Sequence, residues 1–265
     1  MLTADYFFDI SSFGHRELFR ENSPVWAALK GLKEYMADQR FLSLSEIIRP
    51  GEPLSQPVVV LENNFINASG LTFEFGDVNK GGLKISKDGE ILEGASLIMA
   101  GAVLNGSQIR LGRGSLIESG AFLQSPTIIG DNTEIRQGAY IRGYCLAGNR
   151  CVIGHTTEIK HSVLLDGAKA GHFAYLGDSI LGNEVNLGAG TKMANLKFLP
   201  GNILIRTGEQ TYDTGLRKCG AVMGDHSQTG CNAVTNPGTL LGKKTLVAPN
   251  TTAPAGYHKE GTIIR

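Results

Sequence analysis

The chain has 265 residues, of which 35 are glycine and only 19% are charged. Its 25 basic and 25 acidic side chains leave no formal net charge at pH 7, which argues against a general attraction to nucleic acid or to an anionic membrane. No apolar run approaches the ~18 residues that span a bilayer, and the first residues lack the pattern of a signal peptide, so we expect a cytoplasmic protein with frequent tight turns.

Residues 1–45 are expected to form a helical extension. Ser23 and Pro24 make a typical helix start, with serine as the N-cap and proline in the first helical position. Apolar residues then recur at helical spacing, which predicts a helix over about 24–39. His15 and Arg16 could form a functional pair, but their place before the helix favours surface residues. The apolar residues before the helix should pack on it or on the rest of the protein: Phe7, Phe8, Ile10, Phe13 and Leu18.

Residues 46–95 are expected to form irregular strands that lead into the main body. Short runs rich in β-branched and aromatic residues alternate with turn signals such as Lys80-Gly81-Gly82 and Asp88-Gly89. No catalytic or ligand-binding motif is visible in this region. The predicted strands cover 58–61, 71–75 and 82–85.

Residues 96–265 carry a period of six, which is neither the helical nor the strand period. Hexapeptide repeats are the signature of a β-helix. The pattern resembles the left-handed parallel β-helix, so we expect an all-β protein in which three hexapeptides make one turn and aliphatic residues stack about 4.8 Å apart. The unbroken series of aliphatic and small residues is Leu111, Ile117, Leu123, Ile129, Ile135, Ile141, Ala147, Ile153 and Ile159.

The repeat is interrupted twice. Leucines at 176, 181 and 187 show that the period shortens around the segment Ala170-Gly171-His172-Phe173-Ala174-Tyr175. Residues 196–218 then form an excursion, which is long enough to be a functional loop, and the repeat resumes at Met223. A register break in a repeat fold is where we first look for a site.

No metal site is predicted. The four cysteines (Cys145, Cys151, Cys219 and Cys231) form no C-x-x-C pair. The left-handed β-helix fold also supports the three-histidine zinc site of γ-type carbonic anhydrases, and His155 and His161 raise that alternative. Six-residue spacing puts these two histidines on different faces of one turn, and the resemblance supplies no third ligand.

Residues 142–195 closely resemble the acetyltransferase half of the bacterial bifunctional N-acetylglucosamine-1-phosphate uridylyltransferase/glucosamine-1-phosphate acetyltransferase. The matching segments, aligned without gaps, are Ile159-Lys160, Ala170 through Asp178, and Asn186-Leu187-Gly188-Ala189-Gly190-Thr191. From Tyr212 onward the chain is similar to archaeal bifunctional sugar-phosphate nucleotidylyltransferase/acetyltransferases. Nothing in residues 1–110 matches the Gly-rich loop of their nucleotidyltransferase domain.

The resemblance implies that His172 is the general base. An amine must be unprotonated to attack a thioester, and histidine accepts protons near neutral pH. The backbone N–H of Ala189 would stabilise the tetrahedral oxyanion. Asp225 and Ala248 fall where relatives line the acyl-CoA channel, which makes acetyl-CoA the expected co-substrate.

The resemblance also implies that Arg142 and Lys160 bind phosphate. They are eighteen residues apart, which is one full turn, so their side chains should stack and repel each other unless an anion lies between them. The positions that would hydrogen-bond the sugar phosphate are Tyr175, Asn186 and Asn195. A further lysine of the relatives falls near Gly201 here, and Lys197 is the nearest substitute.

The sequence therefore predicts a homotrimeric N-acetyltransferase that acts on an amino-sugar phosphate, with glucosamine-1-phosphate as the leading acceptor. A separate nucleotidyltransferase would then use the product. Two alternatives stay open. The chain could be a trimeric scaffold or regulatory partner without catalysis, or an acyltransferase for another amino sugar or nucleotide sugar.

Overall fold

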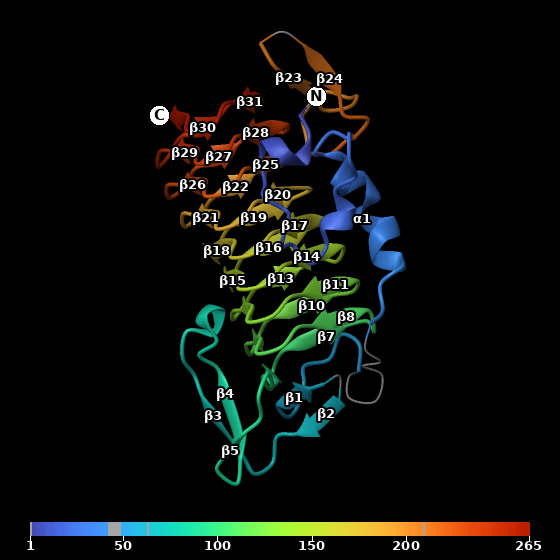
Figure 1. The fold of residues 1–265 in the computed structure, drawn as a ribbon, viewed down its shortest axis with the longest axis vertical. Helices are drawn as coiled ribbons and strands as arrows, with labels where there is room; N and C mark the ends of the chain where they lie inside the picture. Colours follow the sequence, from blue (N-terminus) through green and yellow to red (C-terminus); the bar gives the residue numbers. More distant parts are fainter. Residues whose placement is uncertain (1, 42–48, 63, 209) are drawn as a thin grey trace.

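The computed structural model describes residues 2–41, 49–62, 64–208 and 210–265. They form a mostly β structure, which is dominated by a β-solenoid of about nine turns and drawn as a stack of short strands in Figure 1. The predicted fold class, a β-helix of hexapeptide repeats with a short N-terminal extension, is confirmed. The predicted boundary between residues 45 and 46 lies outside the described residues.

Each turn contributes one short strand to each of three parallel sheets, which we call faces I, II and III. Face I contains β6 (Ser96–Ile98), β9 (Leu116–Ile117), β12 (Glu134–Ile135), β15 (Val152–His155), β18 (Lys169–His172), β21 (Asn186–Leu187), β26 (Gln228–Thr229), β29 (Leu246–Val247) and β32 (Ile263–Ile264). Face II contains β7 (Val103–Asn105), β10 (Phe122–Gln124), β13 (Tyr140–Ile141), β16 (Glu158–Lys160), β19 (Tyr175–Gly177), β22 (Lys192–Met193), β27 (Val234–Thr235) and β30 (Thr252–Ala253). Face III contains β8 (Ile109–Leu111), β11 (Thr127–Ile129), β14 (Cys145–Ala147), β17 (Ser162–Leu164), β20 (Ile180–Leu181), β25 (Ala221–Met223), β28 (Thr239–Leu241) and β31 (Gly256–His258).

The aliphatic residues of the repeat point into the solenoid and stack on their equivalents in the next turn. On face II, Leu123 pairs with Ile141 and Ile141 pairs with Ile159, and all three are fully buried. Removing each such side chain from water contributes about 1.5–3 kcal/mol, so the repeat itself builds the core. The predicted eighteen-residue stacking holds on all three faces for the series from Leu111 to Ile159.

The solenoid period then shortens to seventeen residues, as in the pairing of Ile159 with Leu176. One residue is lost at the corner between faces II and III, near His161, and another near Asp178 one turn later. Both corner residues have a φ of 47°. His172 itself lies in a regular six-residue repeat, so the register breaks flank it instead of containing it.

The N-terminal segment contains α1 (Ala27–Ala37) and the short 3-10 helices η1 (Ala4–Tyr6) and η2 (Arg16–Leu18). The predicted helix over 24–39 is therefore present but shorter. Ala27 N–H donates to the Pro24 carbonyl at 2.8 Å, a three-residue spacing that makes a tight turn before the α-helix begins. The residue at the helix N-cap is Trp26, so Ser23 does not cap the helix as predicted.

Face III is covered by this N-terminal segment, whose blue ribbon runs alongside the strands of that face in Figure 1. The side chains of face III that point away from the solenoid interior are apolar and fully buried: Ile128, Leu146, Val163, Ile180, Val222 and Leu240. They share one core cluster with Phe7, Phe8 and Phe13, which confirms the expected docking of the N-terminal aromatic residues. Faces I and II are thus the sides available to ligands.

His15 is not the surface residue that we predicted. Its Nδ1 lies 2.6 Å from Tyr35 Oη and its Nε2 lies 2.9 Å from an Arg110 guanidinium nitrogen. Tyr35 donates its own proton to Glu17 at 2.7 Å, so His15 Nδ1 must be the donor to Tyr35 and Nε2 the acceptor from Arg110. Burial, together with the Arg110 charge, lowers the pKa of His15 to about 4.

Three additions interrupt or extend the solenoid. Strands β1 (Val58–Leu61) and β2 (Asn64–Asn67) continue face I in antiparallel pairing at its N-terminal end. A projecting antiparallel sheet contains β3 (Leu71–Glu74), β4 (Lys84–Lys87) and β5 (Glu90–Ile91), with η3 (Val78–Lys80) in between. The excursion between β22 and β25 folds back as a hairpin of β23 (Leu204–Arg206) and β24 (Thr211–Asp213).

Candidate active site

The two predicted phosphate-binding cations lie side by side on face II. Arg142 follows β13 and Lys160 ends β16, and their neighbours Ile141 and Ile159 pair across the two strands. Each cation already faces a carboxylate. Arg142 Nη1 lies 2.7 Å from Glu158 Oε1, and Lys160 Nζ lies 3.6 Å from Asp178 Oδ2. The repulsion expected for two stacked cations is therefore balanced by side chains of the same chain.

Asp178 is the polar centre of this cluster. It is only 6% exposed and accepts hydrogen bonds from His161 Nδ1 at 2.9 Å and from Asn195 Nδ2 at 2.5 Å. Burial by itself would raise the pKa of Asp178, but these two hydrogen bonds and the charge of Lys160 outweigh it and hold the pKa below its ordinary value. The carboxylate is therefore ionised at neutral pH.

Tyr175 and Asn195 converge over Gly177. A Cβ at that glycine would lie 2.5 Å from Asn195 Nδ2 and 2.6 Å from Tyr175 Oη, so any larger residue would displace both polar groups. Burial and the nearby charge of Glu158 raise the pKa of Tyr175, which keeps its hydroxyl protonated and able to donate. Two predicted acceptor-binding residues thus lie together, beside the cation pair.

His172 ends β18 at the edge between faces I and II and is exposed. The next residue, Phe173, has a φ of 35°, which turns the chain onto face II. The His172 ring stacks on that of His155 from the preceding turn, with centroids 6.1 Å apart and planes 30° apart. His161 lies at the other edge of face II. Within the residues that the structure describes, no group of three His, Cys, Asp or Glu is arranged to hold a metal ion.

Ala189 lies on the turn above His172. Ala170 pairs with Leu187, so His172 and Ala189, each two residues further on, occupy equivalent positions about 4.8 Å apart along the solenoid. Gly190 N–H donates to the His172 carbonyl at 3.1 Å, while the Ala189 N–H donates no hydrogen bond within the described part of the chain. A potential base and an unused N–H donor are therefore neighbours.

Asp225 does not lie on this edge. Its side chain is 5% exposed and holds the N-terminal segment, because Oδ2 accepts from Asp9 N–H and Oδ1 from Asn183 N–H, both at 2.7 Å. A carboxylate used in this way is not free to line a channel. These contacts therefore argue against the predicted role of Asp225 in the acyl-CoA channel.

The register identifies two residues at this edge that the sequence analysis missed. Leu187, Thr229 and Val247 pair in succession, which puts Cys231 and Pro249 in the same column as Ala189. Counting two residues beyond the inward-facing Thr229 and Val247 gives these positions, but only the strand pairing shows that they share the column of Ala189. Ala248, which was predicted here, precedes Pro249 and is partly exposed on the same edge.

Two other predicted residues, Asn186 and Lys197, do not join the cluster around Asp178 on face II. Asn186 is exposed on face I, where it pairs with Lys169 and Gln228, so one chain does not bring it to the cluster on face II. Lys197 follows Asn195 closely in the chain, but its Nζ donates to the Asn202 carbonyl at 2.6 Å. The loop between them exposes Phe198 completely and Leu199 to 74%.

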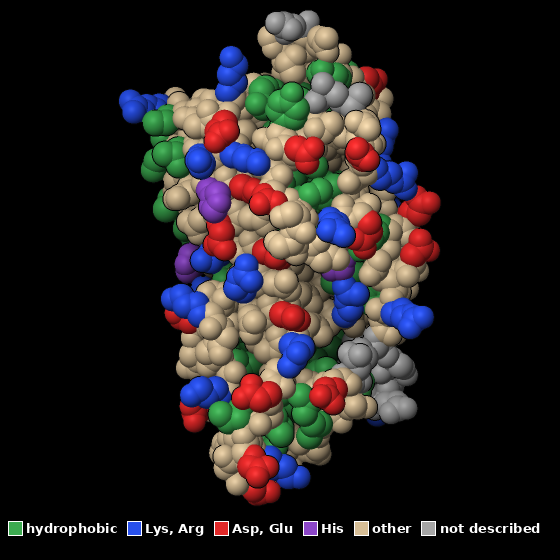
Figure 2. All heavy atoms as spheres, in the orientation of Figure 1, with side chains coloured by type: hydrophobic (Ala, Val, Ile, Leu, Met, Phe, Trp, Pro, Cys, Tyr) green, Lys and Arg blue, Asp and Glu red, His purple; other side chains and the backbone are tan. Residues whose placement is uncertain are grey.

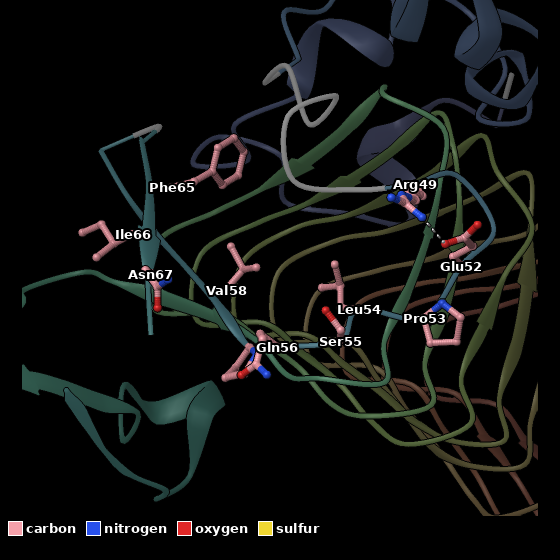
Figure 3. Close-up of a pocket in the computed structure, with 11 residues that line it drawn as sticks. Arg49, Glu52, Pro53, Leu54, Ser55, Gln56, Val58, Phe65, Ile66 and Asn67 are labelled. Atoms are coloured by element: carbon pink, nitrogen blue, oxygen red, sulfur yellow. Dashed lines mark ion pairs between the residues drawn. The ribbon is translucent and has the colours of Figure 1, made fainter. Parts of the chain in front are cut away.

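A larger cavity lies away from these residues. It measures about 580 Å³ at the N-terminal end of the solenoid, where Leu54, Val58 and Phe65 line it beside the Arg49–Glu52 ion pair (Figure 3). None of the predicted site residues borders it. Figure 2 shows acidic and basic side chains interspersed over the visible face, in keeping with local and not general anion binding.

Residues 123–253, just under half of the chain, match the family model described as the GMPPB C-terminal domain. The chain is 36% identical over 151 residues to a bifunctional sugar-1-phosphate nucleotidylyltransferase/acetyltransferase of Sulfurisphaera tokodaii, covering 50% of this chain and 38% of that protein. It is 34% identical over 170 residues to the bifunctional protein GlmU of a Picosynechococcus strain, covering 61% and 32% respectively. The chain thus spans about a third of the length of these relatives.

A solved structure of the acetyltransferase domain of PglB from Neisseria gonorrhoeae, in complex with acetyl coenzyme A, is 13% identical with a TM-score of 0.25 and covers 65% of this chain and 55% of that one. The resemblance expected from residues 142–195 is confirmed by the two curated relatives: the solenoid is a hexapeptide β-helix domain like that of the bifunctional proteins. No helix among the described residues is long and apolar enough to cross a membrane.

Proposed function

We propose that this chain is an acetyl-CoA-dependent N-acetyltransferase that acts on an amino-sugar phosphate, with glucosamine-1-phosphate as its acceptor. The observation that carries the proposal is the position of His172 next to the unused N–H of Ala189 on neighbouring turns. Acyl transfer to an amine needs a base for the nucleophile and a donor for the carbonyl oxygen, close to one reacting carbon.

The proposed reaction accounts for each proton that moves. Acetyl-CoA supplies the acetyl group as a thioester. His172 takes a proton from the amine nitrogen as the new C–N bond forms, and the Ala189 N–H donates to the carbonyl oxygen as that oxygen gains negative charge. His172 then returns the proton to the thiolate when the C–S bond breaks, so the products are an amide and a free thiol.

The cluster on face II supports a phosphate-bearing acceptor. Lys160 lies 3.6 Å from Asp178, too far for a strong hydrogen bond, so its ammonium can turn toward a phosphate oxygen. Arg142 keeps donors in addition to the one used by Glu158, because a guanidinium carries five N–H groups. Tyr175 and Asn195 would donate to the same acceptor from the next turns.

The test is the release of free CoA thiol from acetyl-CoA in the presence of glucosamine-1-phosphate. His172→Ala should lower kcat at least about 100-fold, the usual contribution of a general base. His155→Ala is the matched control, because that ring stacks on His172 from the preceding turn but has no proposed proton to carry. Its kcat should stay within a few-fold of the wild type.

No turnover by the wild type with glucosamine-1-phosphate would reject that acceptor. Acetyl-CoA binding without turnover would direct the search to other amino sugars, whereas no binding would favour a scaffold without catalysis. Equal losses in His155→Ala and His172→Ala would show that the stacked pair is structural.

We propose further that the protein is a homotrimer and that a separate nucleotidyltransferase uses its acetylated product. Face III is covered by the N-terminal segment, while the His172 edge exposes Phe173 to 55%. A partner copy packed along this edge would close a site that one chain leaves open. Light scattering that gives the mass of one chain would reject the trimer.

A further inference from the structure

A groove of about 370 Å³ lies beside the excursion, at the edge between faces II and III. Its lining includes Lys197, Ile203, Leu204, Arg206, Asn236 and Pro237. This volume is at the lower end of the range for small-molecule sites. None of the residues that take part in the proposed acetyl transfer lines this groove.

The groove wall is built into the fold. The Ile203 side chain is 2% exposed, and its N–H and carbonyl bond to Leu216 and Thr214 at 2.8 and 3.2 Å. A Cβ at Gly238 would lie 2.6 Å from the Ile203 side chain, so the excursion sits tightly on the solenoid. A wall fixed in this way needs little ordering when a ligand binds.

The lining has the chemistry of a nucleotide site. Lys197 Nζ donates one proton to Asn202 and has two more for a phosphate, and Arg206 is exposed at the same groove. The Asn236 amide can both donate to and accept from a base or a ribose. Leu204, 43% exposed, and Pro237 offer apolar contact to a planar ring.

The groove and the phosphate-binding end of the candidate active site lie along the same edge of face II. Along face II, Lys160, Gly177, Ala194 and Asn236 occupy one column, because their preceding neighbours pair in succession. Lys160 and Asn236 are therefore three strand spacings apart, about 14 Å. The two positions between them carry no side chain or only a methyl group. Tyr175 and Asn195 fill the space over Gly177, so a ligand that extends from Lys160 to Asn236 would pass across these two side chains.

We propose that this groove binds the nucleotide part of the acceptor, so that the preferred acceptor is a nucleoside-diphosphate-linked amino sugar. This inference rests on the proposed acetyltransferase function and changes its acceptor. The phosphate next to the sugar would lie at Arg142 and Lys160, and the nucleoside would lie between Asn236 and Leu204. Acyl-CoA would follow the opposite edge of face II, past Ala189.

Binding is measured first, because it does not require turnover. By calorimetry, UDP should bind the full chain, and Arg206→Gln and Lys197→Met should each weaken it about tenfold, the loss expected for one charge-assisted contact. Glucosamine-1-phosphate binding should not change in Arg206→Gln. Arg217→Gln, an exposed cation of the same excursion outside the groove lining, is the matched control and should bind UDP like the wild type.

Turnover then compares acceptors. UDP-glucosamine should have a higher kcat/KM than glucosamine-1-phosphate, and Arg206→Gln should remove that advantage. If UDP binds as predicted but neither acceptor is acetylated, the nucleotide groove stands and the proposed acetyltransferase function falls.

Three results would overturn the inference. The first is that the wild type does not bind UDP. The second is that Arg206→Gln and Lys197→Met bind UDP unchanged, which would put the nucleotide elsewhere. The third is that the two variants weaken adenosine 3′,5′-bisphosphate binding and raise the KM for acetyl-CoA but leave UDP unaffected, which would assign the groove to coenzyme A.

Discussion

His161 Nδ1 and Asp178 Oδ1 lie 2.9 Å apart on neighbouring turns, at the corner where the solenoid loses one residue per turn. The second oxygen of Asp178 accepts from Asn195. His161 thus fixes the carboxylate in one orientation, and through it Asn195 and Lys160. The imidazole itself packs against the Tyr144 ring, and the Lys33 ammonium of α1 also lies over that ring, 5.0 Å from its centroid.

We predict that His161→Ala impairs acceptor binding more than the chemical step. Without the imidazole, Asp178 loses a hydrogen bond and can turn toward Lys160, which competes with the acceptor phosphate. The KM for the acceptor should rise about tenfold, while kcat and the KM for acetyl-CoA change little. His161→Asn, which keeps a side-chain N–H, should recover part of the loss. A similar change in the KM of both substrates would indicate general loosening of the fold instead.

Gly177→Ala should also act on the acceptor. The added methyl group would lie 2.6 Å or closer to the Tyr175 hydroxyl and the Asn195 amide, which must both move. Because those atoms are side-chain ends, the fold can absorb the change, and we expect a higher acceptor KM with a nearly unchanged melting temperature.

The matched control for that variant is Gly171→Ala, where a Cβ meets nothing within 4 Å. It should bind the acceptor like the wild type. If Gly177→Ala retained the wild-type KM, the convergence of Tyr175 and Asn195 would have no part in binding.

The sequence was sufficient where the period was regular. Six-residue spacing predicted the stacking of Leu123, Ile141 and Ile159, and the eighteen-residue interval predicted that Arg142 lies beside Lys160. These predictions succeed because a solenoid turns sequence separation directly into spatial neighbours. They did not foresee that Glu158 and Asp178 pair with the two cations, since a hexapeptide count does not say how far a side chain reaches.

The errors arise where an irregular segment meets the solenoid. The use of Asp225 to hold the N-terminal residues depends on contacts 216 residues apart in the chain, which no local pattern encodes. His15 was misplaced for the same reason, because its partner Arg110 lies on face III. The excursion breaks the count between Ala189 and Cys231, so their shared column becomes visible only in the strand pairing.

His15 should make stability depend on pH in a defined window. The folded protein keeps this imidazole neutral down to about pH 4, whereas its ordinary pKa is 6.5. Between these values the unfolded chain binds a proton that the folded chain does not, so stability should fall as the pH drops from 6.5 to 4, by up to about 3 kcal/mol.

Urea unfolding at several pH values measures that effect. The slope of unfolding free energy against pH in this window should be smaller in His15→Gln than in the wild type, whatever the absolute stability of the variant. Identical slopes would show that the neutral imidazole makes no contribution.

The last prediction separates two roles for Asp225. Asp225→Ala removes the acceptor for the backbone N–H groups of Asp9 and Asn183, and each unsatisfied donor should cost about 1–3 kcal/mol. The N-terminal segment should then become sensitive to limited proteolysis, while the KM for acetyl-CoA stays constant in the intact variant. Cys231→Leu is the counterpart, because it adds bulk in the column of Ala189 and should raise the KM for acetyl-CoA without exposing the N-terminus to protease. The opposite pattern, with acetyl-CoA binding lost in Asp225→Ala and retained in Cys231→Leu, would restore Asp225 to the acyl-CoA channel and contradict the register argument.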